Sequence, residues 1–456
     1  MDLNSLYHSL NRFMENTVEL TDTPLVVTLI GGGLFLTFFS GLRPLTKFAH
    51  ALKVLTGRYD REHDPGQLSH FQALSTALAA TIGVGNIGGV AAAISTGGAG
   101  AVFWMWIAAA VGMTSKFFCC SLAQIYRKPN ENGELIGGPM YTIELGMGRK
   151  WKPLAVMFCI FGMVGCLPMY QTNQLAEILQ SELNVAPIMT ARVVTILVAI
   201  VAFGGVVRVG RLTSALVPSM CLLYLLLSLA VIVLRFHAVP TVLKQIVTEA
   251  FTGTAAAGGA TGIAVARVIQ IGVRRAAFSN EAGVGTAPLA HGVAKTSEPI
   301  REGLVAMVGP FLDTLVVCTL TAIVILLAGL DSSGELEGVS LTAAAFSAVL
   351  GPWAAYALVM LVAMFAFSTM VGYSFYGRQC FTYLVGSRWS GVYTLIYLAG
   401  LYFGGVVKPD LVLNTIDVAF VMMAIPNMIA TIYLAPKVMS AARNYFQRLE
   451  AGEFDT

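Results

Sequence analysis

Glycine is concentrated in one apolar stretch, Thr81-Ile82-Gly83-Val84-Gly85-Asn86-Ile87-Gly88-Gly89. Four of the last seven residues of this stretch are glycines, and each glycine costs up to about 1 kcal/mol inside a helix. In a membrane, such a break is tolerated only where the freed N–H and C=O groups face protein, water or a ligand. The stretch therefore predicts a membrane helix that unwinds at mid-membrane to hold a small solute.

The same letters match G-x-G-x-x-G, which occurs in dinucleotide-binding folds. That motif needs a strand before it, a helix after it and an acidic residue about 20 positions further on. Residues 73–80 are mostly Ala and Leu, and residues 102–106 contain no acid. The chain also lacks H-E-x-x-H and G-x-S-x-G, so neither a dinucleotide fold nor a membrane-embedded enzyme is favoured.

The composition is that of a polytopic membrane protein. Of the 456 residues, 56% are hydrophobic and only 12% are charged, whereas a soluble domain carries about 25% charged residues. The seven cysteines form no C-x-x-C pair, so no zinc or redox site is indicated. We expect membrane lipid around the chain, no nucleic-acid partner and no covalent cofactor, and the sequence leaves the oligomeric state open.

About 20 apolar residues span a bilayer, and the hydropathy pattern predicts an all-α fold with eleven spans. A further short helix is expected on the surface at 340–350. The predicted spans are 24–42, 70–96, 101–125, 153–180, 189–206, 213–235, 258–295, 303–330, 352–378, 390–407 and 411–434.

Basic residues recur at every second connection between the spans. The loops at 43–61 and 127–152 each carry five Lys or Arg residues, and such loops face the cytoplasm. With an odd number of spans, the N-terminus is expected outside and the C-terminus in the cytoplasm of a plasma-membrane protein. The acidic residues at 1–23 do not resemble a cleaved signal peptide.

The first glycine break has a counterpart five spans later, where Gly83-Val84-Gly85-Asn86 is echoed by Gly283-Val284-Gly285-Thr286. This spacing predicts two inverted five-helix repeats, at 70–235 and 258–434, within one transporter domain. Residues 1–69 would add an extra helix and a loop, and 435–456 a cytoplasmic tail. Paired broken helices mark the binding site of secondary transporters; the alternative is that both glycine runs only permit close helix packing.

Several longer motifs resemble the alanine/glycine:cation symporter family, and the resemblance runs from about Thr23 to Pro436. It implies a leucine-transporter-like fold and the sodium-coupled, sometimes proton-coupled, import of small neutral amino acids. The motifs are Ala80-Thr81-Ile82-Gly83-Val84-Gly85-Asn86-Ile87, Gly137-Gly138-Pro139-Met140-Tyr141, Phe278-Ser279-Asn280-Glu281-Ala282-Gly283, Gly372-Tyr373-Ser374-Phe375-Tyr376-Gly377 and Ala424-Ile425-Pro426-Asn427.

An amino acid carries a carboxylate, which suits the free N–H groups at the start of a helix half. We therefore place the carboxylate at the backbone N–H groups of Gly83, Val84 and Gly85, near the Thr81 hydroxyl.

The resemblance implies that the ammonium meets the second break, 278–283, which includes Gly283. Ser279 and Asn280 would contribute side chains, Gln171 a further polar contact, and Phe278 a cover over the side-chain pocket. The alternatives are that Gln171 joins two helices by a hydrogen bond and that Phe278 is an ordinary core residue.

The resemblance also implies a sodium site. Its ligands would be the Ala79 and Ile82 carbonyls and the hydroxyls of Ser368 and Thr369, and Asn86 could serve a second ion. The alternative is that the two hydroxyls bond back to their own helix.

Tyr373 stands where members of the family commonly have Trp, which predicts a wider pocket with an added hydroxyl. Arg275 and Asp417 lie near the outward ends of their helices, and we expect them to pair as a gate. Three functions remain open beside alanine or glycine import: transport of glutamine or serine, coupling to protons, and a passive channel. The dominance of Gly, Ala and bulky apolar residues in these spans disfavours a channel.

Overall fold

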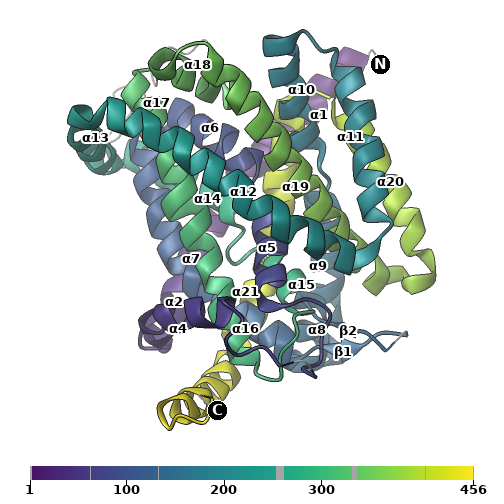
Figure 1. Ribbon diagram of the computed structural model, residues 1–456. Coiled ribbons are helices and arrows are strands. Elements are labelled where there is room, and N and C mark those ends of the chain that lie inside the picture. The colour runs from purple at the N-terminus through teal and green to yellow at the C-terminus, as the bar shows by residue number, and fades with distance from the viewer. Residues whose placement is uncertain are drawn as a thin grey trace.

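The computed structural model describes residues 3–61, 63–131, 133–252, 261–330, 336–405 and 407–454. These residues form a bundle of helices (Figure 1), with one short hairpin in which β1 (Lys128–Pro129) pairs antiparallel with β2 (Leu135–Ile136). The helices are α1 (Leu3–Val26), α2 (Gly32–Phe39), α3 (Arg43–Thr46), α4 (Phe48–Leu55), α5 (His70–Thr81), α6 (Gly88–Gly97), α7 (Gly100–Ile125), α8 (Pro139–Tyr141), α9 (Lys152–Gly165), α10 (Met169–Leu183), α11 (Pro187–Ala202), α12 (Gly205–Leu234), α13 (Val239–Thr252), α14 (Thr261–Asn280), α15 (Ala287–His291), α16 (Pro299–Pro310), α17 (Thr319–Ala328), α18 (Gly338–Leu350), α19 (Trp353–Val385), α20 (Ser390–Gly404) and α21 (Pro409–Glu450).

Among the described residues, seven helical segments are long and apolar enough to cross a membrane, and the bent pair α5 and α6 raises the number to eight. The helices α11 and α18 are apolar but shorter. The predicted count of eleven spans therefore stays a prediction. The predicted seventh span begins at residue 258, which lies outside the described residues.

Several boundaries differ from the predicted ones. The first span was expected from residue 24, but α1 begins at Leu3 and continues through a π-helical turn into α2. The segment expected at 153–180 is divided into α9 and α10. The helix expected on the surface at 340–350 is α18, which buries one face and donates a hydrogen bond from Thr342 to the Ile87 carbonyl. Amphipathic burial of this kind depends on what lies beneath the helix, which hydropathy does not reveal.

The two chain ends lie at opposite ends of the bundle (Figure 1). The end that holds the basic loops at 43–61 and 127–152, α16 and the C-terminal part of α21 is called the basic end below. The opposite end carries α13 and α18. Near the middle of the bundle, α5 packs against α12 and α19, while α14 packs against α6 and α7.

The first glycine stretch breaks a helix as expected. A capping box starts α5, because the Ser69 hydroxyl accepts from the Gln72 N–H and the Gln72 side chain accepts from the Ser69 N–H. The helix ends at Thr81, and the chain passes through a single 3₁₀ turn, Val84–Asn86, before α6 begins. The two helix halves meet at an angle of 58°. A side chain at Gly83 would overlap the Thr369 hydroxyl on α19, so this close approach requires glycine.

The second break separates α14 from α15. Gly283 and Gly285 have φ angles of +85° and +106°, which side chains rarely tolerate. Glu281 is also left-handed, with φ of +53°, which is unusual for a residue with a long side chain. Both glycine echoes of the sequence therefore end a helix inside the bundle, and the second break needs glycine for its backbone geometry.

Candidate substrate and cation site

The predicted cation ligands meet where α19 crosses the end of α5. The Thr369 hydroxyl donates to the Ala79 carbonyl at 3.0 Å, and the Ser368 hydroxyl reaches the same oxygen at 3.4 Å. Each hydroxyl also contacts the Phe365 carbonyl of its own helix. Ile82 is buried just beyond the end of α5. The arrangement brings a carbonyl and two hydroxyl oxygens together, which is the donor chemistry that a hard cation such as Na⁺ prefers.

The backbone of the first break offers a smaller set of donors than expected. The Gly83 N–H donates to the Asn86 side chain at 3.0 Å, and the Thr81 hydroxyl bonds back to the Ala77 carbonyl at 3.1 Å. The N–H groups of Val84 and Gly85 make no hydrogen bond among the described residues. Free N–H groups in a buried turn are donors of the kind that an anion accepts from.

Phe278 covers the first break. A side chain at Gly85 would lie 3.1 Å from the Phe278 ring, so the glycine lets the ring approach the backbone. Tyr170 packs edge-on against Phe278, with ring centroids 5.2 Å apart, and Phe420 lies 6.2 Å away. The Arg275 guanidinium stands 5.5 Å from the ring centroid. Phe278, which lies just before the second break, therefore also contacts the first break. Tyr170 and Phe420 pack around its ring.

An acidic residue that the sequence analysis missed joins both breaks. Asp313 lies on a π-helical turn between α16 and α17, and its side chain is fully buried. It accepts from the Asn86 amide at 2.7 Å, from the Ser279 hydroxyl at 2.6 Å and from the Thr314 hydroxyl at 2.7 Å. Asp313 is the only acid in the predicted span 303–330, and a lone membrane-embedded acid is the signal that could have identified it.

The other predicted substrate residues have contacts of their own. Asn280 donates to the Thr314 hydroxyl at 2.9 Å and accepts from the Ala282 N–H. The Gly283 carbonyl accepts from Asn427 at 2.8 Å. The Gln171 side-chain oxygen is buried and has no hydrogen-bond partner among the described residues. The Asn280 side chain therefore supports the break itself, whereas the Gln171 oxygen takes no part in these contacts.

The Tyr373 hydroxyl is hydrogen-bonded to a buried acidic side chain. It donates to the Glu281 carboxylate, and the Thr286 hydroxyl donates to the other oxygen of the same carboxylate. The two hydroxyls satisfy a buried acid at a left-handed position. The sequence predicted that Tyr373 would add a hydroxyl to the side-chain pocket. In the structure this hydroxyl donates to Glu281 and supports the second break.

Arg275 and Asp417 are in direct contact, and both are buried. Arg274 lies 4.0 Å from Asp417 and 3.3 Å from Asp22 of α1, and Arg267 lies 3.3 Å from the other Asp22 oxygen. Among the described residues, one arginine–aspartate cluster is formed by Asp22, Arg267, Arg274, Arg275 and Asp417. The sequence indicated the central pair but not its extension to α1, because the docking of the extra N-terminal helix is a tertiary feature.

Two broken helices that meet inside a bundle of membrane-spanning helices are typical of secondary transporters. Residues 6–456 match the model of the sodium:alanine symporter family. The chain is 39% identical to the sodium/alanine symporter AgcS of Methanococcus maripaludis over 98% of both chains. It is 36% identical to the probable sodium/glutamine symporter GlnT of Bacillus subtilis, covering 94% of this chain and 89% of GlnT.

The chain belongs to the sodium:alanine symporter family. It is accordingly a sodium-coupled amino acid symporter and a multi-pass membrane protein, and not an enzyme. Among solved structures it resembles MhsT in complex with L-phenylalanine, with a TM-score of 0.53 and 13% identity, over 82% of this chain and 98% of MhsT. This similarity confirms the leucine-transporter-like fold that the motifs indicated.

Proposed function

We propose that the protein imports small neutral amino acids such as alanine and glycine, together with Na⁺, by alternating access. The observation that carries this proposal is the close approach of Phe278, at the second break, to Gly85 in the first. A ring so close to the backbone leaves room for a small side chain and disfavours a large one. The 39% identical relative AgcS, a sodium/alanine symporter by name, supports the same substrate class.

The substrate carboxylate is assigned to the unpaired N–H groups of Val84 and Gly85, and the Gln171 oxygen is available to the ammonium. Na⁺ is assigned to Ser368, Thr369 and the carbonyls of Ala79 and Ile82. A second cation is assigned to Asn86, and we add Asp313 because its carboxylate supplies the negative charge that an uncharged amide lacks.

In this proposal the two repeats, 70–235 and 258–434, move relative to each other around the breaks. The basic end faces the cytoplasm because Lys and Arg are retained on that side, and the opposite end faces outward. The Arg275–Asp417 contact then closes the outer path.

A larger neutral amino acid such as glutamine is the second candidate, supported by the name of the relative GlnT. Proton coupling is a variant of either candidate.

A proteoliposome uptake panel tests these assignments. Radiolabelled glycine, alanine, serine and glutamine are each offered with a sodium gradient, with a proton gradient alone, and with neither. We expect alanine and glycine to accumulate only with sodium. Preferred accumulation of glutamine would replace the substrate assignment, and accumulation driven by protons alone would replace the ion assignment.

A further inference from the structure

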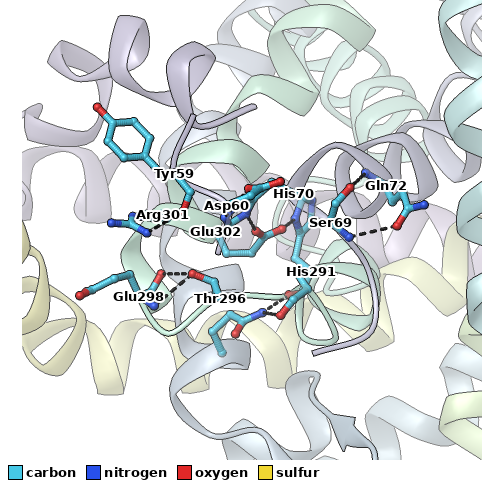
Figure 2. Close-up of polar contacts among 12 residues, drawn as sticks. Tyr59, Asp60, Ser69, His70, Gln72, His291, Thr296, Glu298, Arg301 and Glu302 are labelled. Atoms are coloured by element: carbon cyan, nitrogen blue, oxygen red, sulfur yellow. Dashed lines mark hydrogen bonds and ion pairs between the residues drawn. The ribbon is translucent and has the colours of Figure 1, made fainter. Parts of the chain in front are cut away.

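A buried carboxylate at the basic end is shared by two histidines that are far apart in the sequence. Glu302, on α16, accepts a hydrogen bond from His70 with one oxygen and from His291 with the other. All three side chains are essentially inaccessible to solvent. Figure 2 shows the two imidazoles converging on the Glu302 carboxylate, with Asp60 beside His70.

The three residues connect the two broken helices. His70 is the first residue of α5, and His291 is the last residue of α15, so each stands at the basic end of a broken span. Glu302 lies on the next helix, α16. Any path from the breaks to the basic end must separate these helix ends, because both broken spans terminate there. We call His70, His291 and Glu302 the basic-end latch.

Backbone pairing reinforces the latch. The segment that precedes α5 is joined to the segment that follows α15, since the Gln67 N–H donates to the Val293 carbonyl at 2.8 Å and the Lys295 N–H donates to the Leu68 carbonyl at 2.6 Å. Arg127 donates to carbonyls on both segments. The latch and this backbone pairing must open together. Exchange of the paired amides therefore reports on the opening of the latch.

The geometry distinguishes the two histidines. His291 Nε2 is buried and makes no hydrogen bond among the described residues, so His291 has an acceptor only at Nδ1. His70 has a carboxylate at each nitrogen, with Glu302 at Nδ1 and Asp60 at 3.8 Å from Nε2. A protonated imidazole carries two N–H donors. Of the two histidines, His70 is the one with a carboxylate facing each ring nitrogen, hydrogen-bonded at Nδ1 and 3.8 Å away at Nε2.

We propose that His70 binds a proton in the closed state, and that this imidazolium, facing Glu302, holds the basic end shut. Loss of the proton leaves Glu302 with two neutral donors and weakens the latch, so the path opens more readily as pH rises. Such a role presupposes the transport cycle proposed above, whereas the latch itself can be tested without substrate or sodium.

Other charged groups surround the latch. Asp60 lies on the preceding loop, Arg301 is the neighbour of Glu302 on α16, and Arg127 lies just beyond the end of α7. Arg301 is held by the Tyr59 carbonyl and the Tyr445 hydroxyl. Guanidinium groups stay charged throughout the physiological range. His70 is therefore the group that makes the latch respond to pH near neutrality.

Hydrogen exchange of the purified full-length protein tests the latch. The reporters are the amides of Gln67, Leu68, Lys295 and Thr296, which all take part in the pairing between the two segments. We expect Glu302→Gln and His70→Gln to raise exchange at these amides roughly tenfold, because each removes a charged hydrogen bond. The matched control is His237→Gln, an exposed histidine on the opposite end, which should leave them unchanged. Unchanged exchange in both latch variants would overturn the latch.

The pH dependence separates proton binding from a merely structural contact. After correction for the intrinsic exchange rate, the unmodified protein should lose about fivefold protection at the reporter amides between about pH 6 and about pH 8. His70→Asn keeps an N–H donor near the Nδ1 position but cannot titrate, so it should show the lower protection of the deprotonated state at both pH values, without the pH dependence. An equal pH dependence in His70→Asn would overturn the assignment of the proton to His70.

Discussion

The second broken helix is anchored by a carboxylate from another helix on each side of its break, and the two anchors differ in chemistry. Before the break, Arg275 of α14 contacts Asp417 of α21, with Arg274 and Asp22 alongside. After the break, His291 contacts Glu302, which His70 shares. A guanidinium remains charged at any physiological pH, whereas an imidazole gains or loses its charge near neutrality. The comparison contrasts an anchor whose cation keeps its charge with one whose cation, in our proposal, loses its charge as pH rises.

Breaking the arginine–aspartate anchor should have the largest effect. Arg275→Ala and Asp417→Ala each strand a buried charge, so we expect each to reduce sodium-driven uptake by roughly a hundredfold, corresponding to about 3 kcal/mol. The double variant should lose much less than the product of the two, which a double-mutant cycle in proteoliposomes measures.

Replacement of Arg274, which lies between Asp22 and Asp417, gives a comparison variant for this cycle. Arg274→Ala leaves the direct Arg275–Asp417 contact in place and should cost less than Arg275→Ala. Strictly additive losses for Arg275→Ala and Asp417→Ala would show that the contact does not gate transport. Membrane levels of each variant have to be equal before uptake rates are compared.

The proposed cation ligands Ser368 and Thr369 should show the next largest effect. Ser368→Ala combined with Thr369→Ala removes both hydroxyls at the Ala79 carbonyl. We expect the sodium concentration for half-maximal uptake to rise roughly tenfold, while the order of preferred amino acids stays the same. Thr369→Ser keeps its hydroxyl and serves as the control. Sodium activation identical to that of the unmodified protein would remove both residues from the ion site.

Tyr373 tests whether support of the second break matters for transport. Tyr373→Phe removes the donor to Glu281 and leaves that buried carboxylate with the Thr286 hydroxyl alone. We expect Tyr373→Phe to lower uptake of all substrates about fivefold. Tyr373→Trp keeps a ring N–H and should instead reduce the uptake of larger substrates more than that of glycine. Uptake by Tyr373→Phe equal to that of the unmodified protein would show that the hydroxyl contact is dispensable.

The smallest expected effect is the pH dependence of amide exchange near Arg275, which compares the two anchors directly. Amides of α14 around Arg275 should change exchange by less than about twofold between about pH 6 and about pH 8, after correction for the intrinsic rate, because the guanidinium does not titrate there. The reporter amides at the basic end are measured in the same experiment. A parallel pH response at both ends would mean that the whole bundle loosens, and that the histidines are not its cause.

Local sequence determined the membrane class, most of the helical segments and the two breaks. Clusters of glycine in apolar segments interrupt helices wherever they occur, so Gly83, Gly85 and Gly283 could be recognised without any knowledge of their neighbours. The contact between Arg275 and Asp417 was also anticipated, because two opposite charges at the same depth in a membrane need partners. The neighbouring hydroxyls of Ser368 and Thr369 were expected near Ala79, and they lie there.

Only the tertiary structure decided which buried polar groups meet. Asp313 joins Asn86 to Ser279, and Glu302 joins His70 to His291, through contacts between residues separated by as many as 232 positions. Helix propensity and hydropathy act over a few residues and carry no information about such partners. A buried donor or acceptor nevertheless needs a hydrogen-bond partner, because leaving it unpaired costs about 1–3 kcal/mol. Which partner it finds depends on how the distant helices pack, and that packing also turned the Tyr373 hydroxyl toward Glu281.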